Sequence, residues 1–156
     1  MVQVRLDSRP NNARGWLARS RVVLTRTPWR IEISRARRRA TLRYAGRTAA
    51  RWRVVVGKPW TPTPAGLFAI QDSFRSPPKS FAGAWILTLT AHSQALATYD
   101  GGDGRVALHG RGGASLLDPL GSAASHGCIR FDNKAIGEIV RRVGRDHLPG
   151  VPVQIT

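Results

Sequence analysis

Short runs in which apolar and polar side chains alternate dominate the chain from residue 29 onward. In "WRIEIS", for example, Ile31 and Ile33 alternate with charged residues. A period of two places alternate side chains on one face of a strand, so each run predicts a strand with one buried face. The 10 prolines and 16 glycines suit many short elements joined by turns. Because 156 residues suffice for one core, we expect a single, mainly β domain.

Alternating or β-branched runs predict seven strands. They lie at residues 29–34, 40–46, 51–57, 66–72, 85–92, 105–110 and 151–156. The first two resemble the arms of a hairpin. The stretch "KPWTPTPAG" carries three prolines and a glycine, which preclude regular structure there.

One segment near the C-terminal end follows a helical period instead. Four apolar residues are spaced i, i+3, i+4 and i+7 and therefore share one helical face. They are Ile136, Ile139, Val140 and Val143. Asp132 or Asn133 can cap the start of this helix, and Gly144 can end it. The sequence therefore predicts one short helix.

The charge balance is strongly basic, with 25 Lys and Arg residues against nine Asp and Glu residues and a formal net charge of +16. Such a surface attracts polyanions, either nucleic acid or the anionic polymers of a bacterial envelope. The alternative is that the excess of arginine reflects genomic base composition rather than binding. The basic run at residues 35–39 has no interleaved aromatic residue on which a base could stack, which favours a solvated turn. No apolar run reaches about 18 residues, so we expect no transmembrane helix.

The single cysteine, Cys128, lies in the stretch "SHGCIRF" and has no partner for a disulfide within the chain. An ordinary thiol is mostly protonated at neutral pH, so nucleophilic use requires a nearby base or positive charge. His109, His126 and Arg130 are the candidates. Gly127 lets the backbone turn so that consecutive N–H groups can point at one oxyanion. This chemistry favours acyl transfer, although an incidental thiol beside two unrelated histidines remains an alternative on the residues alone.

Metal binding is the other common use of cysteine and histidine. Cys128 and His126 are two positions apart, but His92 and His147 add no spacing typical of a four-ligand site. The turn "YDGGDG" offers too few oxygen ligands for calcium. We therefore expect neither a metal nor a cofactor.

Around His109 and Cys128 the chain resembles a known family, the catalytic domain of bacterial L,D-transpeptidases, also called the YkuD-type domain. The family motif is a histidine followed by a small residue, a loop, and then Ser/Thr-His-Gly-Cys, a hydrophobic residue and Asn or Arg. Here it reads "HGRGGASLLDPLGSAASHGCIR". The resemblance extends over residues 29–156 and implies an L,D-transpeptidase-type β-sandwich or barrel with one short helix after the cysteine motif. Residues 1–28 are expected to be an N-terminal edge segment or the tail of a preceding module.

The resemblance implies a peptidoglycan L,D-transpeptidase. In such enzymes the cysteine attacks a stem tetrapeptide, forms a thioester with loss of D-alanine, and passes the acyl group to an amine for wall cross-linking or protein attachment. By position, Cys128 would be the nucleophile and His109 the general base. The carbonyl of Gly110 would orient the His109 ring, and no acidic residue is expected near the site. A carbapenem would acylate Cys128.

The same resemblance assigns roles to the neighbouring residues. The amides around Gly127 would form the oxyanion hole, while His126 and Ser125 would support the loop. Arg130 would bind a substrate carboxylate. Residues 75–92 would include a flap over the site, stiffened by two prolines, Pro77 and Pro78.

Two other functions remain open. Water could replace the amine as acceptor, which would make the protein an L,D-carboxypeptidase or endopeptidase, or the protein could be a basic polyanion-binding module without enzymatic activity. The family implies an extracytoplasmic location in the cell envelope or periplasm, with donor and acceptor stem peptides and anionic wall polymers as partners and no specific nucleic acid. No signal peptide is visible in "MVQVRLDSRPNNARGW", so we expect residue 1 to lie inside a longer reading frame.

Overall fold

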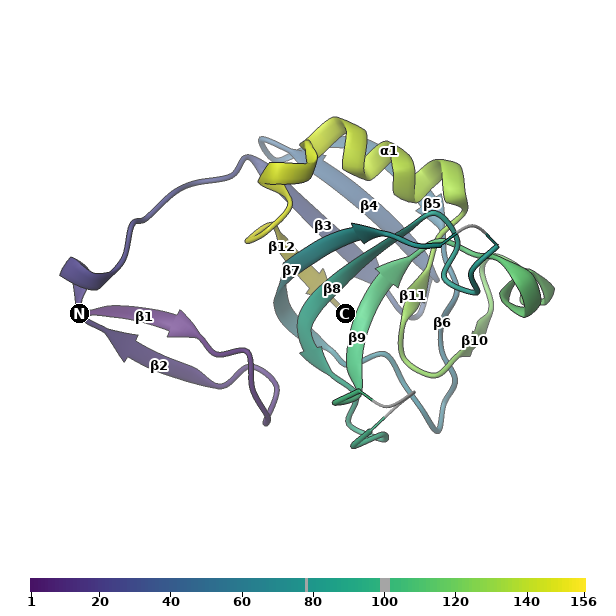
Figure 1. Ribbon diagram of the computed structural model, residues 1–156, viewed down its shortest axis with the longest axis horizontal. Coiled ribbons are helices and arrows are strands. Elements are labelled where there is room, and N and C mark those ends of the chain that lie inside the picture. Colours follow the sequence, from purple (N-terminus) through teal and green to yellow (C-terminus); the bar gives the residue numbers. More distant parts are fainter. Residues whose placement is uncertain (78, 99–101) are drawn as a thin grey trace.

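The protein is described by a computed structural model that covers residues 1–77, 79–98 and 102–156. Its main sheet has eight strands in the order β11-β9-β8-β7-β12-β3-β4-β5 and curls into a half-barrel, with α1 packed over it (Figure 1). The bounds are β3 (Trp29–Ser34), β4 (Arg39–Tyr44), β5 (Arg47–Arg53), β7 (Gly66–Arg75), β8 (Trp85–His92), β9 (Arg105–His109), β11 (Ile129–Arg130), β12 (Pro152–Ile155) and α1 (Asn133–Val143). The expected mainly β fold with one α-helix after the cysteine motif is confirmed.

The alternating pattern correctly predicts which faces are buried. β3 and β4 form the expected hairpin, in which Ile31 lies opposite Leu42, and both side chains are fully buried. Tyr44 is an exception, because it is half exposed and packs against Trp29 with ring centroids 4.6 Å apart. Alternation therefore locates the core side of the sheet, except at the open end of this hairpin.

The prediction of one strand over residues 51–57 is wrong. β5 ends at Arg53, and β6 (Val56–Gly57) pairs in parallel with β10 (Ala123–Ser125) in a separate two-stranded sheet. Between them Val55 forms a bridge to Arg130. The valine run is buried because the chain crosses here from the edge of the main sheet to the cysteine segment, and the uniformly β-branched run does not reveal that change of partner.

The predicted helix is confirmed as α1. Asp132 is its N-cap, since its carboxylate accepts a hydrogen bond from the Lys134 amide at 2.8 Å, and Gly144 follows its last residue with a φ of 85°. The apolar face packs into the core, and Ile136 and Ile139 are fully buried. The helix thus closes the half-barrel directly after the cysteine segment.

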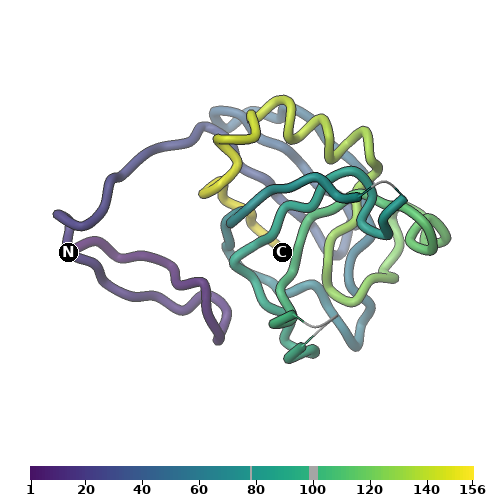
Figure 2. The backbone as a smooth tube through the Cα atoms, in the orientation of Figure 1, coloured from purple at the N-terminus to yellow at the C-terminus, as the bar shows by residue number. Residues whose placement is uncertain are grey.

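Residues 1–28 show a hairpin that periodicity did not predict. β1 (Val2–Arg5) pairs with β2 (Arg14–Leu17), and within the described residues neither strand joins the main sheet. Figures 1 and 2 show the hairpin beside the half-barrel, with residues 18–28 leading back to β3. The described residues also form three 3₁₀ turns, at Arg19–Arg21, Gly113–Leu117 and Arg145–His147.

The helix packing supports a prediction on stability. Replacing Ile139 with alanine leaves a cavity beneath α1, so we expect the free energy of unfolding to fall by about 2–5 kcal/mol. The exposed Lys134→Ala substitution on the same helix should change it by about 0.5 kcal/mol or less. Urea unfolding of both variants measures the difference, and equal losses would contradict this packing.

Candidate active site

The pairing of β11 with β9 brings the two predicted chemical groups together. The strands run in parallel, with Arg130 opposite His109, and Cys128 directly precedes β11. The Phe131 amide donates a hydrogen bond to the His109 carbonyl at 2.8 Å. Cys128 and His109 both line one cavity of about 490 Å³. Cys128 and His109 are 19 positions apart in the sequence, and the short pairing of β11 with β9 brings them to the same cavity.

His109 is almost fully buried, and its ring is held by the next residue. Nδ1 lies 2.7 Å from the carbonyl oxygen of Gly110. Because a carbonyl can only accept, Nδ1 carries the proton and Nε2 of the neutral ring keeps its lone pair. Burial and, to a smaller extent, the positive charge of Arg130 outweigh hydrogen bonds to the main chain of Gly110 and Ala82, and together they lower the pKa of His109 to about 4. His109 is therefore a neutral base at neutral pH.

Asn133, the first residue of α1, holds the bend that follows His109. Its side-chain oxygen accepts hydrogen bonds from the amides of Ala84 and Arg111, and its Nδ2 donates to the Arg111 carbonyl at 2.8 Å. A Cβ on Gly110 would lie 2.1 Å from that oxygen, so only glycine fits. Sequence reasoning considered Asn133 only as a helix cap and missed this contact.

Cys128 is half-buried, and its thiol is neutral at rest. Burial raises the pKa of the Cys128 thiol above its ordinary value, while a hydrogen bond from the main chain of Ala107 and the charge of Arg130 act in the opposite direction. A neutral thiol therefore faces the same cavity as a neutral imidazole. Deprotonation of the sulfur then requires transfer of its proton to a base rather than a preformed thiolate.

Ser125 closes the turn that precedes the cysteine. Its hydroxyl donates to the carbonyl of Cys128 at 2.6 Å and accepts from the amide of Gly127 at 3.1 Å. Gly127 has a φ of 124°, a backbone conformation that residues with a side chain rarely adopt. The Gly127 amide is thus occupied by the Ser125 hydroxyl, and the role of these amides toward an oxyanion stays a prediction.

The proline-rich stretch before β7 fastens this turn from the other side. The hydroxyl of Thr63 donates to the Gly127 carbonyl at 2.8 Å and accepts from the Gly57 amide at 2.9 Å. Thr61 donates to the Ser125 carbonyl at 3.3 Å. The sequence showed that this stretch is irregular but not that its threonines hold the cysteine loop.

Arg130 lies buried in the cavity wall. Its Nη1 is 2.5 Å from a carboxylate oxygen of Asp118, and its guanidinium lies 4.9 Å from the centre of the Phe81 ring. The expectation that no acidic residue is near the site is therefore wrong. Because Asp118 belongs to the long irregular loop between the two motif halves, its position could not be read from spacing.

The residues before β8 cover one side of the cavity. Phe81 and Ala82 line it, and the Phe81 and His109 ring centroids are 6.3 Å apart. Ser115 holds this segment by donating to the Phe81 carbonyl at 2.8 Å. The flap predicted within residues 75–92 stays a prediction. Residues 85–92 of that range form β8 and so belong to the main sheet, and Pro78 lies outside the described residues.

His126 is exposed and also lines the cavity. Its role in supporting the loop stays a prediction. The described residues contain no group of three or more histidine, cysteine or acidic side chains placed to hold a metal ion. They also contain no helix with the length and apolar character needed to cross a membrane.

Comparison with known proteins identifies the family. The family model of the L,D-transpeptidase catalytic domain matches residues 28–155, which is well over half of the 156-residue chain. The chain belongs to this family. The resemblance first seen in the His109 and Cys128 motifs is thereby confirmed.

Individual relatives share part of the sequence or the fold. The chain is 29% identical over 112 residues to the putative L,D-transpeptidase YkuD of Bacillus subtilis, which covers 72% of this chain and 58% of that protein. The catalytic domain of an Enterococcus faecium L,D-transpeptidase has a similar fold, with a TM-score of 0.58, 20% identity and coverage of 82% of this chain and 96% of that one. An L,D-transpeptidase from Mycobacterium tuberculosis matches with a TM-score of 0.61, 16% identity and coverage of 83% and 57%.

The threonine contacts can be tested by an isosteric substitution. Thr63→Val leaves the Gly57 amide and the Gly127 carbonyl without their partner, so we expect a loss of about 1–3 kcal/mol in the free energy of unfolding. Thr61→Val is the matched control, because the Ser125 carbonyl keeps its bond from the Lys58 amide. Chemical denaturation should show the larger loss for Thr63→Val, and the opposite order would refute the role assigned to Thr63.

Proposed function

We propose that this protein is a peptidoglycan L,D-transpeptidase in which Cys128 forms a thioester with a stem tetrapeptide. The observation that carries the proposal is the shared cavity, which is lined both by the neutral imidazole of His109, oriented by the Gly110 carbonyl, and by the single thiol of the chain. Membership of the family supplies the reaction class. The substrate, the acceptor and the individual roles of the residues are our inference.

In the proposed acylation, Sγ of Cys128 attacks the carbonyl carbon of the bond that precedes the terminal D-alanine. Nε2 of His109 takes the thiol proton as the carbon–sulfur bond forms. The tetrahedral intermediate then collapses, the carbon–nitrogen bond breaks, and the protonated His109 returns the proton to the leaving amine. The products are a thioester on Cys128 and free D-alanine.

The second half of the reaction reverses these roles. The amine of an acceptor stem peptide attacks the thioester, His109 accepts a proton from that amine, and the new amide bond releases Cys128. If water attacks instead, the product is a shortened stem peptide with a free carboxylate. The choice between amine and water depends on the acceptor side of the cavity, and we favour the amine because the family is one of transpeptidases.

The cavity offers groups for the charges that develop. The Cys128 amide would donate to the oxyanion, with Gly127 shaping the turn and Ser125 holding it. Arg130 would attract a substrate carboxylate, as a guanidinium binds such groups well. The contact between Arg130 and Asp118 fixes the guanidinium and also offsets part of its charge. We therefore expect Arg130 to set the local potential as well as to bind substrate.

A peptidoglycan substrate places the protein outside the cytoplasmic membrane, in the cell envelope or periplasm. The net charge of +16 would favour retention near anionic wall polymers. The donor and acceptor stem peptides are then its partners, and the chemistry requires no metal or cofactor.

Intact-protein mass spectrometry tests the proposal. Incubation with a carbapenem should add the mass of one inhibitor molecule to the protein, because the strained β-lactam amide of the carbapenem acylates an activated thiol. Peptide mapping should place this adduct on Cys128. Cys128→Ala should form no adduct, and His109→Gln should react at least about 100-fold more slowly through loss of the base. A folded, reduced wild-type protein that forms neither this adduct nor a thioester with a stem tetrapeptide would count decisively against the enzyme and favour a polyanion-binding module.

A further inference from the structure

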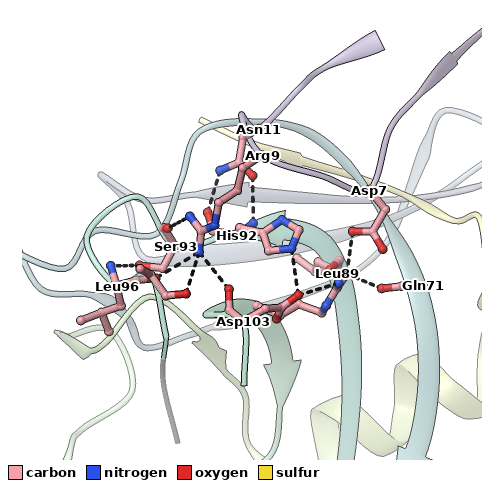
Figure 3. Close-up of polar contacts among 11 residues, drawn as sticks. Asp7, Arg9, Asn11, Gln71, Leu89, His92, Ser93, Leu96 and Asp103 are labelled. Atoms are coloured by element: carbon pink, nitrogen blue, oxygen red, sulfur yellow. Dashed lines mark hydrogen bonds and ion pairs between the residues drawn. The ribbon is translucent and has the colours of Figure 1, made fainter. Parts of the chain in front are cut away.

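The turn that joins β1 to β2 contacts the catalytic domain through polar side chains (Figure 3). Three of them bind main-chain groups of the domain rather than other side chains: Arg9, Asn11 and Asn12. Main-chain groups have fixed positions relative to the strands that carry them. These contacts therefore attach the hairpin to a particular part of the domain.

Arg9 makes the largest set of contacts. Nη1 donates to the Ser93 carbonyl at 2.5 Å, and Nη2 donates to the carbonyls of Leu96, Ala97 and Asp103 at 3.1, 3.3 and 2.9 Å. One planar guanidinium thus forms hydrogen bonds both with the segment after β8 and with the segment before β9. A guanidinium suits this task because its donors point outward in a rigid plane.

The segments held by Arg9 form one wall of the catalytic cavity. Ser93, Leu96 and Gly104 line the same cavity as Cys128 and His109. The wall is closely packed, since a Cβ on Gly104 would lie 2.3 Å from the Leu96 carbonyl and 2.9 Å from Nη2 of Arg9. A hairpin outside the main sheet therefore reaches the edge of the reaction site through one side chain.

Two further contacts strengthen the attachment. The side-chain amide of Asn11 bonds to both main-chain groups of His92. Its Nδ2 donates to the His92 carbonyl at 2.6 Å, and its Oδ1 accepts from the His92 main-chain amide at 2.9 Å. Asp7 forms an ion pair of 2.6 Å with Arg105, another residue that lines the cavity. Figure 3 shows Asn11 beside His92, the last residue of β8, and Asp7 on the other side of His92 from Ser93.

We propose that Arg9 is a positioning residue that holds the Ser93–Leu96 and Gly104 wall of the cavity in the shape that binds the acyl donor. This inference rests on the proposed function and adds to it that the N-terminal hairpin completes the donor site. Arg9 touches neither Cys128 nor His109, so it acts on donor binding and not on proton transfer. The hairpin consequently determines which donors fit that end of the cavity.

The proposal predicts a separation of kinetic constants. Arg9→Ala should raise KM for acylation by a stem tetrapeptide by about tenfold, the change expected for loss of a charged hydrogen-bonding group, and should leave kcat within about twofold. Arg9→Lys should resemble Arg9→Ala, because one ammonium cannot replace the planar donors. Arg14→Ala is the matched control in the same hairpin, since its side chain contacts Gln3, and it should leave KM unchanged.

Two measurements separate this effect from general damage. Alkylation of Cys128 by iodoacetamide, a probe too small to require the wall, should proceed at the same rate in wild type and Arg9→Ala. Hydrogen exchange should accelerate by about tenfold at the amides of Ser93 and Leu96, which lie in the wall, and not at Ile33 in β3. Unchanged exchange at the wall, or faster exchange with unchanged KM, would overturn the proposal.

The same experiment distinguishes failure of the proposed function. A wild-type protein that forms no thioester with the tetrapeptide contradicts the proposed enzyme. The exchange comparison does not depend on acylation, so it still decides whether Arg9 holds the wall. If the enzyme fails but the wall loosens in Arg9→Ala, Arg9 holds the wall while its proposed effect on donor binding falls with the enzyme. A wall that does not loosen refutes the positioning role itself.

Discussion

The position of the short strand β11 is the constraint on which the site depends. β11 has only two residues, yet it pairs with β9 on one side and is bridged to Val55 on the other, with two hydrogen bonds of 2.9 Å between Val55 and Arg130. Because Cys128 directly precedes this strand, its position relative to His109 is set by main-chain pairing and not by side-chain packing alone. The threonine contacts and the Ser125 turn then determine how the sulfur and its amide face the cavity.

Burial gives the site its electrostatic character. It lowers the pKa of His109 and raises that of the Cys128 thiol, so both groups are neutral at rest. The positive charge of Arg130 lowers both pKa values, so it adds to the effect of burial on His109 and opposes it on Cys128. The contact with Asp118 weakens both influences of that charge. In the mechanism that we propose, such a site holds a base and an acid ready for proton transfer, and charge would appear only when a substrate is attacked. The surrounding main-chain groups are then available to stabilise it.

Much of this arrangement could be predicted from the sequence, because alternation, helical spacing and the cysteine motif can all be read from short stretches of the chain. Alternation located most strands of the sheet, and the spacing of Ile136 and Ile139 located the helix. The motif singled out His109 and Cys128. The residues that sequence reasoning missed make contacts between distant segments: Asp118 with Arg130, Thr63 with Gly127, and Arg9 with the end of β8. Each lies in an irregular stretch without periodicity, where position depends on the finished fold.

The pH dependence of Cys128 acylation tests the central claim most directly. The claim is that neutral His109 removes the thiol proton, so kcat/KM for acylation should stay level below neutrality and fall only as His109 is protonated, with an acid midpoint at about pH 4. His109→Gln should remove that midpoint together with most of the rate. An acid midpoint near pH 6.5, the ordinary value for an exposed histidine, or a rate that does not depend on His109, would contradict the account.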